Sequence, residues 1–576
     1  MRARAIWLMM IFAAGCHSSA SKSTKKAPLP AVVAQKQADI ESRKKWLEDF
    51  IDQHVRRLQP LWKANNLAYW LAATTGAQDA YTVNAELELA IRQLYSSAEE
   101  FQALKKALAA PAEFSPLVRR QAELLLLRYQ ENQLPQELTR KMVELSTEIQ
   151  RLFNTWRAEL DGKQLSDSEL IAILRTSPDS EKRRRAWEAY QQRGALIAEK
   201  LLELVRLRNQ AARQLGFENY YQMQLLLMEQ RPEEIKNIFD ELARVTDVPF
   251  AALMQQLKAD VSRRFAIRPE EIRPWHLDDP FFQEAPQVGN LDLDAFFAGK
   301  DPVQLVIRFF SGLGLEVEDV LQKSDLFPRA GKMPHAFCTD MDRKGDVRVL
   351  ANFSPTEGQF STLLHELGHA VYSKYLSRDL PWLLREEAHP FTTEAVAMLF
   401  GRLTRSAAWL TAAVGVPPAQ IERLSPAIEK QLRTSQLVMA RWTLVMVNFE
   451  RALYENPEQD LNTLWWNLKE RFQLLKAPAR PQGAADWAAK IHITAWPVYY
   501  HNYMLGEMLA SQLLYFLAAR HNNTPQNLQF WENRQIGQYL IENIFIPGRS
   551  LRWDELIKKA TGESLQPKYF ADQFAK

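Results

Sequence analysis

Two histidines, His365 and His369, stand four residues apart in a segment whose apolar spacing predicts one helix from 358 to 376. Four residues turn an α-helix by about 400°, so both imidazoles leave it from nearly the same face. The apolar positions are Phe360, Leu363, Leu364, Leu367, Val371 and Leu376. Two such imidazoles, with Glu366 beside the first, can bind one zinc ion and let the glutamate reach a metal-bound water.

Several downstream residues could be the third protein ligand. Glu394 lies about one turn into a second helix that Pro390 is expected to open, and it can point back at the first helix. Glu386, Glu387 and His389 are also available, although a residue just before proline favours an extended backbone. Three protein ligands and a fourth position for water are typical of a catalytic zinc, and we predict one Zn2+ per chain.

The N-terminus predicts export. Arg2 and Arg4 precede an apolar stretch, 5–14, that is too short to span a bilayer. The stretch runs into Ala-Ala-Gly-Cys, which resembles a bacterial lipobox, so we expect Cys16 to be lipidated and to become the mature N-terminus. A conventional secretory signal cleaved nearby is the alternative. The lipid would hold the exported protein on a membrane surface, facing the periplasm or the outside.

The organisation expected after this signal, residues 1–16, is simple. The polar run 17–38 predicts a flexible tether, and 39–576 a zinc-dependent catalytic domain. Besides Cys16 the chain has only Cys338, so lipidation leaves no intrachain disulfide. Its 72 basic and 69 acidic side chains nearly balance. There is no basic stripe with interleaved aromatic residues, so nucleic acid is not an expected partner.

Helical spacing dominates from residue 39 onward and predicts an all-α fold. One β-hairpin is expected, where apolar runs at 335–339 and 347–351 flank the polar turn 342–346. Its edge strand could bind a peptide backbone by strand addition, or the hairpin could serve stability alone. The apolar segment 503–520 contains a glutamate and a glutamine, which indicates a buried helix rather than a membrane span.

The residues around and beyond the zinc motif resemble a known family. The similar blocks are Asp379-Leu380-Pro381, Leu384-Arg385-Glu386, Glu394-Ala395, Arg441-Trp442, Trp465-Trp466-Asn467-Leu468-Lys469, Lys490-Ile491-His492-Ile493 and Tyr500-His501-Asn502-Tyr503. They resemble the zinc peptidases of the peptidyl-dipeptidase A, or angiotensin-converting enzyme, type. The resemblance implies a large two-lobed helical ellipsoid with a deep central cleft and a small sheet beside the zinc helix. It also favours Glu394 as the third ligand.

The resemblance implies catalytic roles as well. Glu366 is the general base, and His492 and Tyr503 stabilise the oxyanion, an arrangement that suits an oxyanion hole beside zinc. One extra residue separates His492 from the tyrosine block, so Tyr500 or His501 could instead occupy the position of Tyr503.

Substrate-binding roles follow from the same resemblance. Lys490 and Tyr500 would bind the C-terminal carboxylate of a substrate, and His335 and Ala336 would hold its backbone. The expected activity is the release of dipeptides from the C-termini of oligopeptides. A thimet-type oligopeptidase that cuts short peptides internally is the nearest alternative. An inactive, membrane-tethered peptide-binding protein is the alternative that is not an enzyme.

Three positions depart from the family pattern. If Trp275-His276-Leu277 matches the family's Trp-Ala-Gln motif, leucine replaces the glutamine of the carboxylate pocket, and Gln283 is the nearest glutamine. Asn502 stands where the family has an arginine linked to chloride activation, so chloride dependence is doubtful. Met398 stands where the family has an aspartate that supports a zinc histidine, so that support must come from another residue.

Overall fold

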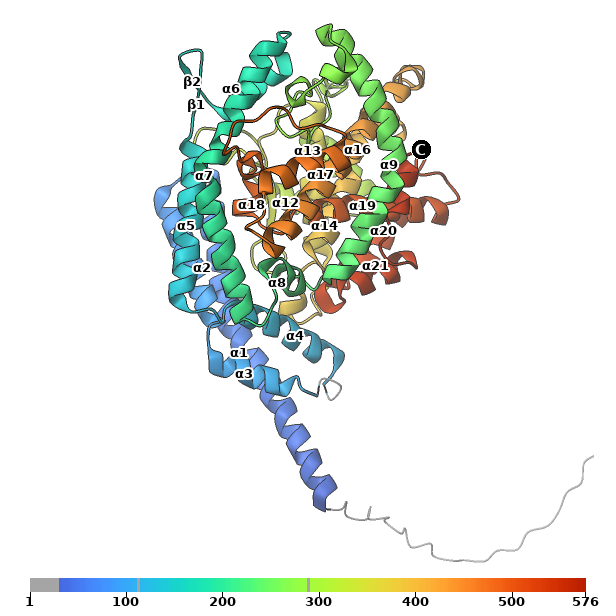
Figure 1. Cartoon of the computed structure of the whole chain (residues 1–576). Helices are drawn as coiled ribbons and strands as arrows, with labels where there is room; N and C mark the ends of the chain where they lie inside the picture. Colours follow the sequence, from blue (N-terminus) through green and yellow to red (C-terminus); the bar gives the residue numbers. More distant parts are fainter. Residues whose placement is uncertain (1–30, 111–113, 287–290) are drawn as a thin grey trace, which may run out of the picture.

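The computed structural model describes residues 31–110, 114–286 and 291–576, and helices dominate them (Figure 1). The helices of the N-terminal half are α1 (Ala31–Thr75), α2 (Gln78–Leu94), α3 (Ala98–Ala107), α4 (Pro116–Glu131), α5 (Gln136–Thr155), α6 (Asp167–Thr176), α7 (Ser180–Gln214), α8 (Tyr220–Leu227) and α9 (Pro232–Phe265). Short helices follow: α10 (Asp294–Phe297), α11 (Pro302–Gly312) and α12 (Glu318–Lys323). The expected all-α fold is confirmed.

The C-terminal half contains the helices that carry the predicted site. They are α13 (Glu357–Tyr375), α14 (Pro390–Gly401), α15 (Ala407–Trp409), α16 (Pro418–Glu455), α17 (Leu461–Gln473), α18 (His492–Ala495), α19 (His501–Arg520), α20 (Arg534–Leu540), α21 (Trp553–Thr561) and α22 (Lys568–Phe574). The expected zinc helix is α13. The apolar segment expected to form a buried helix is α19, most of whose residues are buried.

Two glycines allow α13, α14 and α19 to pack closely. A Cβ atom on Gly368 of α13 would lie 2.7 Å from the Cα of Ala397 in α14, so the two backbones meet at a distance that only glycine permits. A Cβ atom on Gly506 of α19 would lie 3.1 Å from the Cβ of Glu394 in α14. Gly368 lies between Glu366 and His369, so the close contact brings α14 directly beside the zinc motif.

Strands form two antiparallel pairs in the described residues. The expected hairpin is confirmed as β3 (Phe337–Asp340) and β4 (Val347–Leu350), with Phe337 opposite Leu350. A second hairpin, β1 (Ala158–Leu160) with β2 (Lys163–Leu165), was not expected from the sequence. In the described part of the chain β3 pairs with β4 alone, so its other edge has no strand partner.

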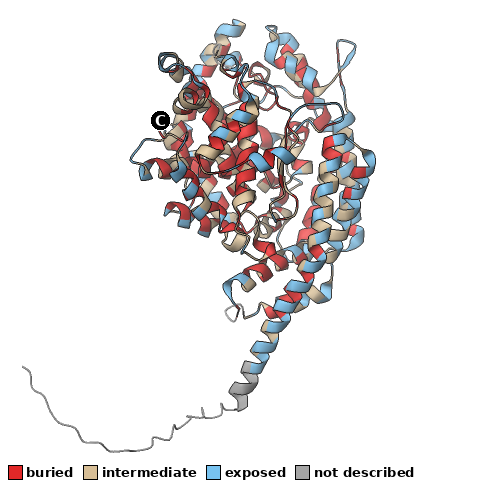
Figure 2. Cartoon of the chain, turned by 180° about the vertical axis from the view of Figure 1, so that it is seen from behind, coloured by how far each residue is buried: buried red, intermediate tan, exposed pale blue. Residues whose placement is uncertain are grey.

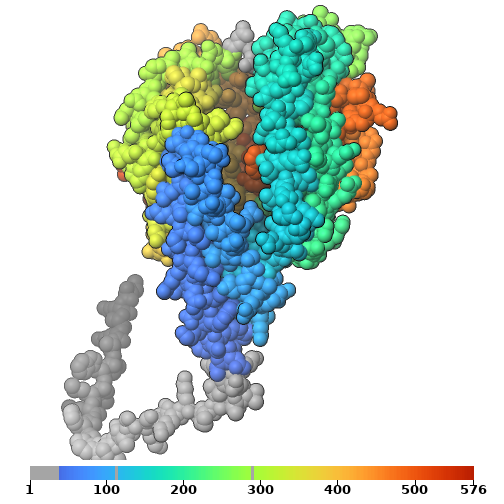
Figure 3. Space-filling view, turned by 90° about the vertical axis from the view of Figure 1, so that its left-hand side faces the viewer, coloured from blue at the N-terminus to red at the C-terminus, as the bar shows by residue number. Residues whose placement is uncertain are grey.

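Buried residues concentrate at the centre of the molecule (Figure 2). One large apolar core surrounds the helices from α13 to α19, a smaller core joins α1, α3 and α4, and a third lies against α9. Figure 3 shows a hollow between α1, with the segments beside it, and the wall formed by α5 to α7. This face agrees with the expected two-lobed shape with a central cleft.

The expected N-terminal features fall mostly outside the described residues. Cys16 and the signal lie there, as does the tether up to residue 30. The last part of the expected tether, 31–38, belongs to α1, which begins at Ala31 directly after Pro30. This stretch has no glycine or further proline to interrupt a helix, so it joins α1. No helix in the described ranges has both the length and the apolar character needed to cross a bilayer.

Candidate metal centre and peptide-binding cleft

Three side chains from α13 and α14 converge as the sequence predicts. The Nε2 atoms of His365 and His369 lie 3.2 Å apart, and Glu394 Oε2 lies 3.6 Å from the first and 3.9 Å from the second. Tetrahedral zinc with ligands at about 2.0–2.1 Å separates its ligand atoms by about 3.3 Å, so this donor set fits one zinc ion. Among the described residues, it is the one such group of histidine, cysteine and acidic side chains.

The protonation of the donors also suits a cation. Burial lowers the pKa of His365 to about 4, and burial together with His365 lowers the pKa of His369 well below its usual value. Both imidazoles are therefore neutral at pH 7, the form that binds metal. Burial and the nearby Glu394 raise the pKa of Glu366 to about 8. A divalent cation beside these two carboxyl groups would favour their ionised forms.

Thr393 supplies the support that the sequence left unassigned. Its hydroxyl oxygen lies 2.8 Å from Nδ1 of His369. Because Nε2 of this histidine faces the metal position, Nδ1 carries the proton and donates it in a hydrogen bond to Thr393. Met398, at the position of the family's aspartate, has no polar group for this purpose. Thr393 directly precedes Glu394, so α14 provides both a ligand and the residue that orients another ligand.

The other candidate ligands have different contacts. Glu386 forms ion pairs with Arg343 and, at 2.8 Å, with Arg549. Burial opposes ionisation of Glu386, but these two guanidinium groups lower its pKa to about 2. His389 caps α14 by accepting a hydrogen bond of 3.2 Å from the backbone N–H of Phe391. Glu387 is outside the convergent group, although its charge helps to raise the pKa of Glu394 to about 7, after the larger effect of burial.

The predicted oxyanion-binding residues, His492 and Tyr503, both pack against the ring of Tyr500. The rings of His492 and Tyr500 are 5.1 Å apart, and those of Tyr500 and Tyr503 are 5.4 Å apart. Burial raises the pKa of Tyr503, and the charge of Glu394 raises it further. Tyr503 lies three residues before Gly506, the glycine of α19 that packs against Glu394. Burial lowers the pKa of His492 to about 3, so it is neutral and can donate one N–H.

Tyr500 and His501, the two alternatives to Tyr503 as oxyanion donor, have other hydrogen-bond partners. The Tyr500 hydroxyl accepts a hydrogen bond of 2.7 Å from the indole N–H of Trp442. His501 is buried, with Nε2 2.7 Å from Gln230 Oε1. Tyr499 is a residue that the sequence reasoning missed: its ring lies 5.4 Å from that of Tyr503, and Glu394 contributes to its raised pKa after the larger effect of burial. Tandem tyrosines before a helix give no sign of which one faces the site.

Lys490 lies beside Gln283, the glutamine nearest to Leu277 in the sequence. Its ammonium group donates a hydrogen bond to Gln283 Oε1 and lies 5.5 Å from the ring centroid of Tyr500. The side chain is buried, and in the described residues no carboxylate oxygen lies within 4.0 Å of its Nζ. Gln283 therefore contacts the lysine that is predicted to bind the substrate carboxylate. Asn502 is buried, accepts a hydrogen bond of 2.9 Å from Gln230, and provides no cation for a chloride ion.

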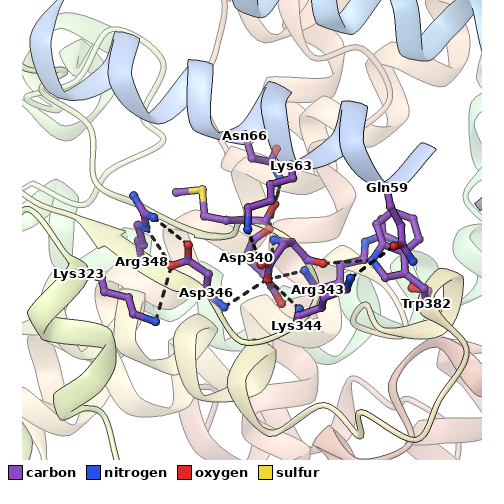
Figure 4. A network of polar contacts seen from close by, with 12 residues as sticks. Gln59, Lys63, Asn66, Lys323, Asp340, Arg343, Lys344, Asp346, Arg348 and Trp382 are labelled. Atoms are coloured by element: carbon purple, nitrogen blue, oxygen red, sulfur yellow. Dashed lines mark hydrogen bonds and ion pairs between the residues drawn. The ribbon is translucent and has the colours of Figure 1, made fainter. Parts of the chain in front are cut away.

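His335 and Ala336 lie directly before β3 and line a pocket of about 480 Å3 together with His365 and Glu366. The free edge of β3 therefore starts beside the zinc motif. The turn of the hairpin is fastened to α1, as Figure 4 shows. The Lys63 ammonium pairs with Asp342 at 3.1 Å.

A second contact strengthens this junction. The guanidinium of Arg343 lies between the rings of Trp62 and Trp382, 4.2 and 4.3 Å from their centroids. Trp62 belongs to α1, whereas Trp382 belongs to the segment between α13 and α14. The hairpin is therefore held between the N-terminal helix and the helices of the metal site, which limits the movement of its edge strand.

Comparison with known proteins agrees with this geometry. Residues 303–572 match the family model described as angiotensin-converting enzyme, and residues 173–324 match that of peptidase family M3. The chain is 23% identical to angiotensin-converting enzyme of Rattus norvegicus over 466 residues, 73% of this chain and 34% of that protein.

Two other relatives bear on activity. Oligopeptidase A of Salmonella typhimurium is 22% identical over 430 residues, 63% of this chain and 60% of that protein. An inactive angiotensin-converting enzyme-related protein of Caenorhabditis elegans is 22% identical over 366 residues, 57% of this chain and 40% of that protein. The matched region thus spans between about a third and three-fifths of these relatives. These matches and the all-α fold support a relationship of the chain to the zinc peptidases of the angiotensin-converting enzyme type.

Proposed function

We propose that this protein is a zinc metallopeptidase that releases dipeptides from the C-termini of oligopeptides. The observation that carries the proposal is a row of side chains leading from the metal ligands to a buried ammonium group. Tyr503 lies three residues before Gly506, where a Cβ atom would lie 3.1 Å from the Cβ of Glu394. The ring of Tyr500 lies 5.4 Å from that of Tyr503, and the Lys490 ammonium lies 5.5 Å from the ring centroid of Tyr500. An extended dipeptide spans about 7 Å, a length that this row can accommodate.

The reaction follows from the positions of the side chains. When bound by His365, His369 and Glu394, zinc supplies a Lewis acid that acidifies water and polarises the scissile carbonyl. Glu366 takes the proton of the attacking water and passes it to the leaving amine. Its side chain is largely buried beside the metal ligands, where a carboxylate is a stronger base than in water.

Two groups of residues orient the peptide. His492 and Tyr503 each offer one donor to the oxygen that gains negative charge in the transition state. Lys490 attracts the C-terminal carboxylate of the substrate and fixes how far the scissile bond lies from the chain end. His335, Ala336 and the free edge of β3 bind the backbone by strand addition.

The experiment has two comparisons. Purified protein is incubated with a set of short peptides and their C-terminal amides, and hydrolysis is followed for the wild type and for Glu366→Gln. We expect zinc in both proteins, hydrolysis by the wild type alone, and much faster cleavage of the free acids than of the amides. Equal cleavage of acids and amides would favour the internally cutting oligopeptidase. Zinc-free wild type without hydrolysis would favour the inactive peptide-binding protein.

Export and lipidation form a separate proposal. Cys16 would carry acyl chains that hold the catalytic body on a membrane surface. Metabolic labelling with a palmitate analogue should mark the wild type and not Cys16→Ser. Recovery of unlabelled wild type in the soluble fraction would contradict the proposal.

A further inference from the structure

The segment between α18 and α19 connects the two proposed oxyanion donors. His492 begins α18, and Tyr503 lies in the first turn of α19. Within the connecting turn, Val498 has a φ of 55°. A β-branched residue rarely adopts this left-handed conformation, so surrounding contacts must hold the backbone there. Val498 is almost completely buried, with 1% of its surface exposed.

Two buried charged side chains from other helices hold this segment. Glu450 of α16 accepts a hydrogen bond of 2.9 Å from the backbone N–H of Val498 through Oε1. Arg208 of α7 donates hydrogen bonds to the carbonyl oxygens of Ile493 at 3.1 Å and Thr494 at 2.7 Å. Glu450 and Arg208 are 2% and 7% exposed. Each contact therefore satisfies a buried backbone group that water does not reach.

Arg208 and Glu450 hold different parts of the segment that carries His492 and Tyr503. Arg208 holds the backbone of α18, the helix that starts at His492. Glu450 holds the turn that leads into α19 and Tyr503. Neither side chain belongs to the group of residues that we place against the substrate. Their separate attachment points determine the position of His492 relative to Tyr503.

We propose that Glu450 is a positioning residue for peptide cleavage, one that holds the strained turn at Val498 and thereby aligns His492 and Tyr503. Arg208 of α7 has the corresponding role for the backbone of α18. This role rests on the proposed function, because the alignment matters only if both residues stabilise an oxyanion. Displacement of either donor by about 1 Å is sufficient to lower a rate by about 100-fold.

The first test compares Glu450→Leu with Glu450→Gln. Leucine removes the acceptor of the Val498 N–H, whereas glutamine keeps an oxygen at the same place. We expect leucine to lower kcat at least about 10-fold, with KM within about 2-fold and zinc content unchanged. Glutamine should restore at least about half of the wild-type kcat. Leu125→Ala, in the separate core of the N-terminal helices, is the control for a loss of stability without displacement of the turn.

A double-mutant cycle distinguishes positioning from stability. If Glu450 acts through Tyr503, then Tyr503→Phe should reduce kcat much less in the Glu450→Leu background than in the wild type. Additive losses, or a loss below about 2-fold in Glu450→Leu, would overturn the proposal. If Glu450→Leu does not fold, Arg208→Lys takes its place: it keeps the charge but loses the paired carbonyl contacts, and an unchanged kcat would overturn the proposal.

Amide hydrogen exchange tests the contact between Glu450 and Val498 without relying on peptide cleavage. The wild type should protect the amide of Val498, and a peptide covering 493–500 should exchange faster in Glu450→Leu and at the wild-type rate in Leu125→Ala. If the wild type cleaves no peptide, the proposed function fails, while exchange still tests the anchor. Equal exchange in wild type and Glu450→Leu would overturn the anchor itself.

Discussion

Replacement of Lys490 by methionine should remove the selectivity for a free C-terminus. Methionine keeps a long unbranched side chain but removes the ammonium group. Lys490 is only 6% exposed, and its Nζ lies 5.4 to 5.5 Å from the ring centroids of Phe281, Trp442 and Tyr500. Water therefore screens little of its attraction for a substrate carboxylate.

The size of the loss follows from this burial. Truncation of one partner of a buried, hydrogen-bonded charge pair costs about 2–5 kcal/mol. Gln283 and Tyr500 remain beside position 490 as polar groups, so we expect the lower part of this range. A loss of about 2–3 kcal/mol corresponds to about 30- to 150-fold in kcat/KM.

The assay measures kcat/KM for one peptide as the free acid and as the C-terminal amide. The wild type should prefer the acid, and Lys490→Met should lose about 30-fold or more on the acid while leaving the amide unchanged. Lys469→Met is a matched control, because this second buried lysine is already bonded at 2.7 Å to Phe281 O and to Gln473 Oε1. An equal loss on acid and amide, or the same selectivity change in Lys469→Met, would refute the assignment of Lys490.

Three further predictions concern the support of a metal ligand, the general base and the pH dependence set by Lys490. Thr393→Val should weaken zinc binding by about 10- to 100-fold in competition with a chelator, because His369 loses the acceptor that orients it; unchanged zinc affinity would count against that role. Glu366→Gln should keep zinc and lose nearly all hydrolysis, and full activity would exclude Glu366 as the base. Burial lowers the pKa of Lys490 to about 8, against the opposing charges of Asp279 and Glu284. A lowered pKa means that the ammonium is lost as pH rises through about 8, so KM for free-acid peptides should rise there, and a flat KM profile would contradict the assignment.

The parts of the site that the sequence predicts well depend on local spacing. The apolar stripe around His365 and His369 determines helix α13, and the proline before Glu394 determines the start of α14. A glycine in the polar turn between two apolar runs gives the hairpin. Each of these signals lies within a short window of sequence, where the periodicity of a helix or strand is direct evidence.

The contacts that the sequence could not predict join residues far apart in the chain. Gln283 reaches Lys490 across 207 positions, and Glu450 reaches Val498 across 48. The left-handed backbone at Val498 has no local signal, because valine is a poor choice for that conformation. Tertiary packing overrides the local preference there. The start of α1 at Ala31 is a further feature that the composition of 17–38 did not predict.

The most direct measurement is mass spectrometry of the products of a single unblocked peptide in which every residue has a different mass. The protein is incubated with the peptide, and the products are identified over time. We expect successive loss of two residues from the C-terminus, with each released dipeptide present in the mixture. Fragments cut at internal bonds without this ladder, or intact peptide with zinc-loaded protein, would contradict it.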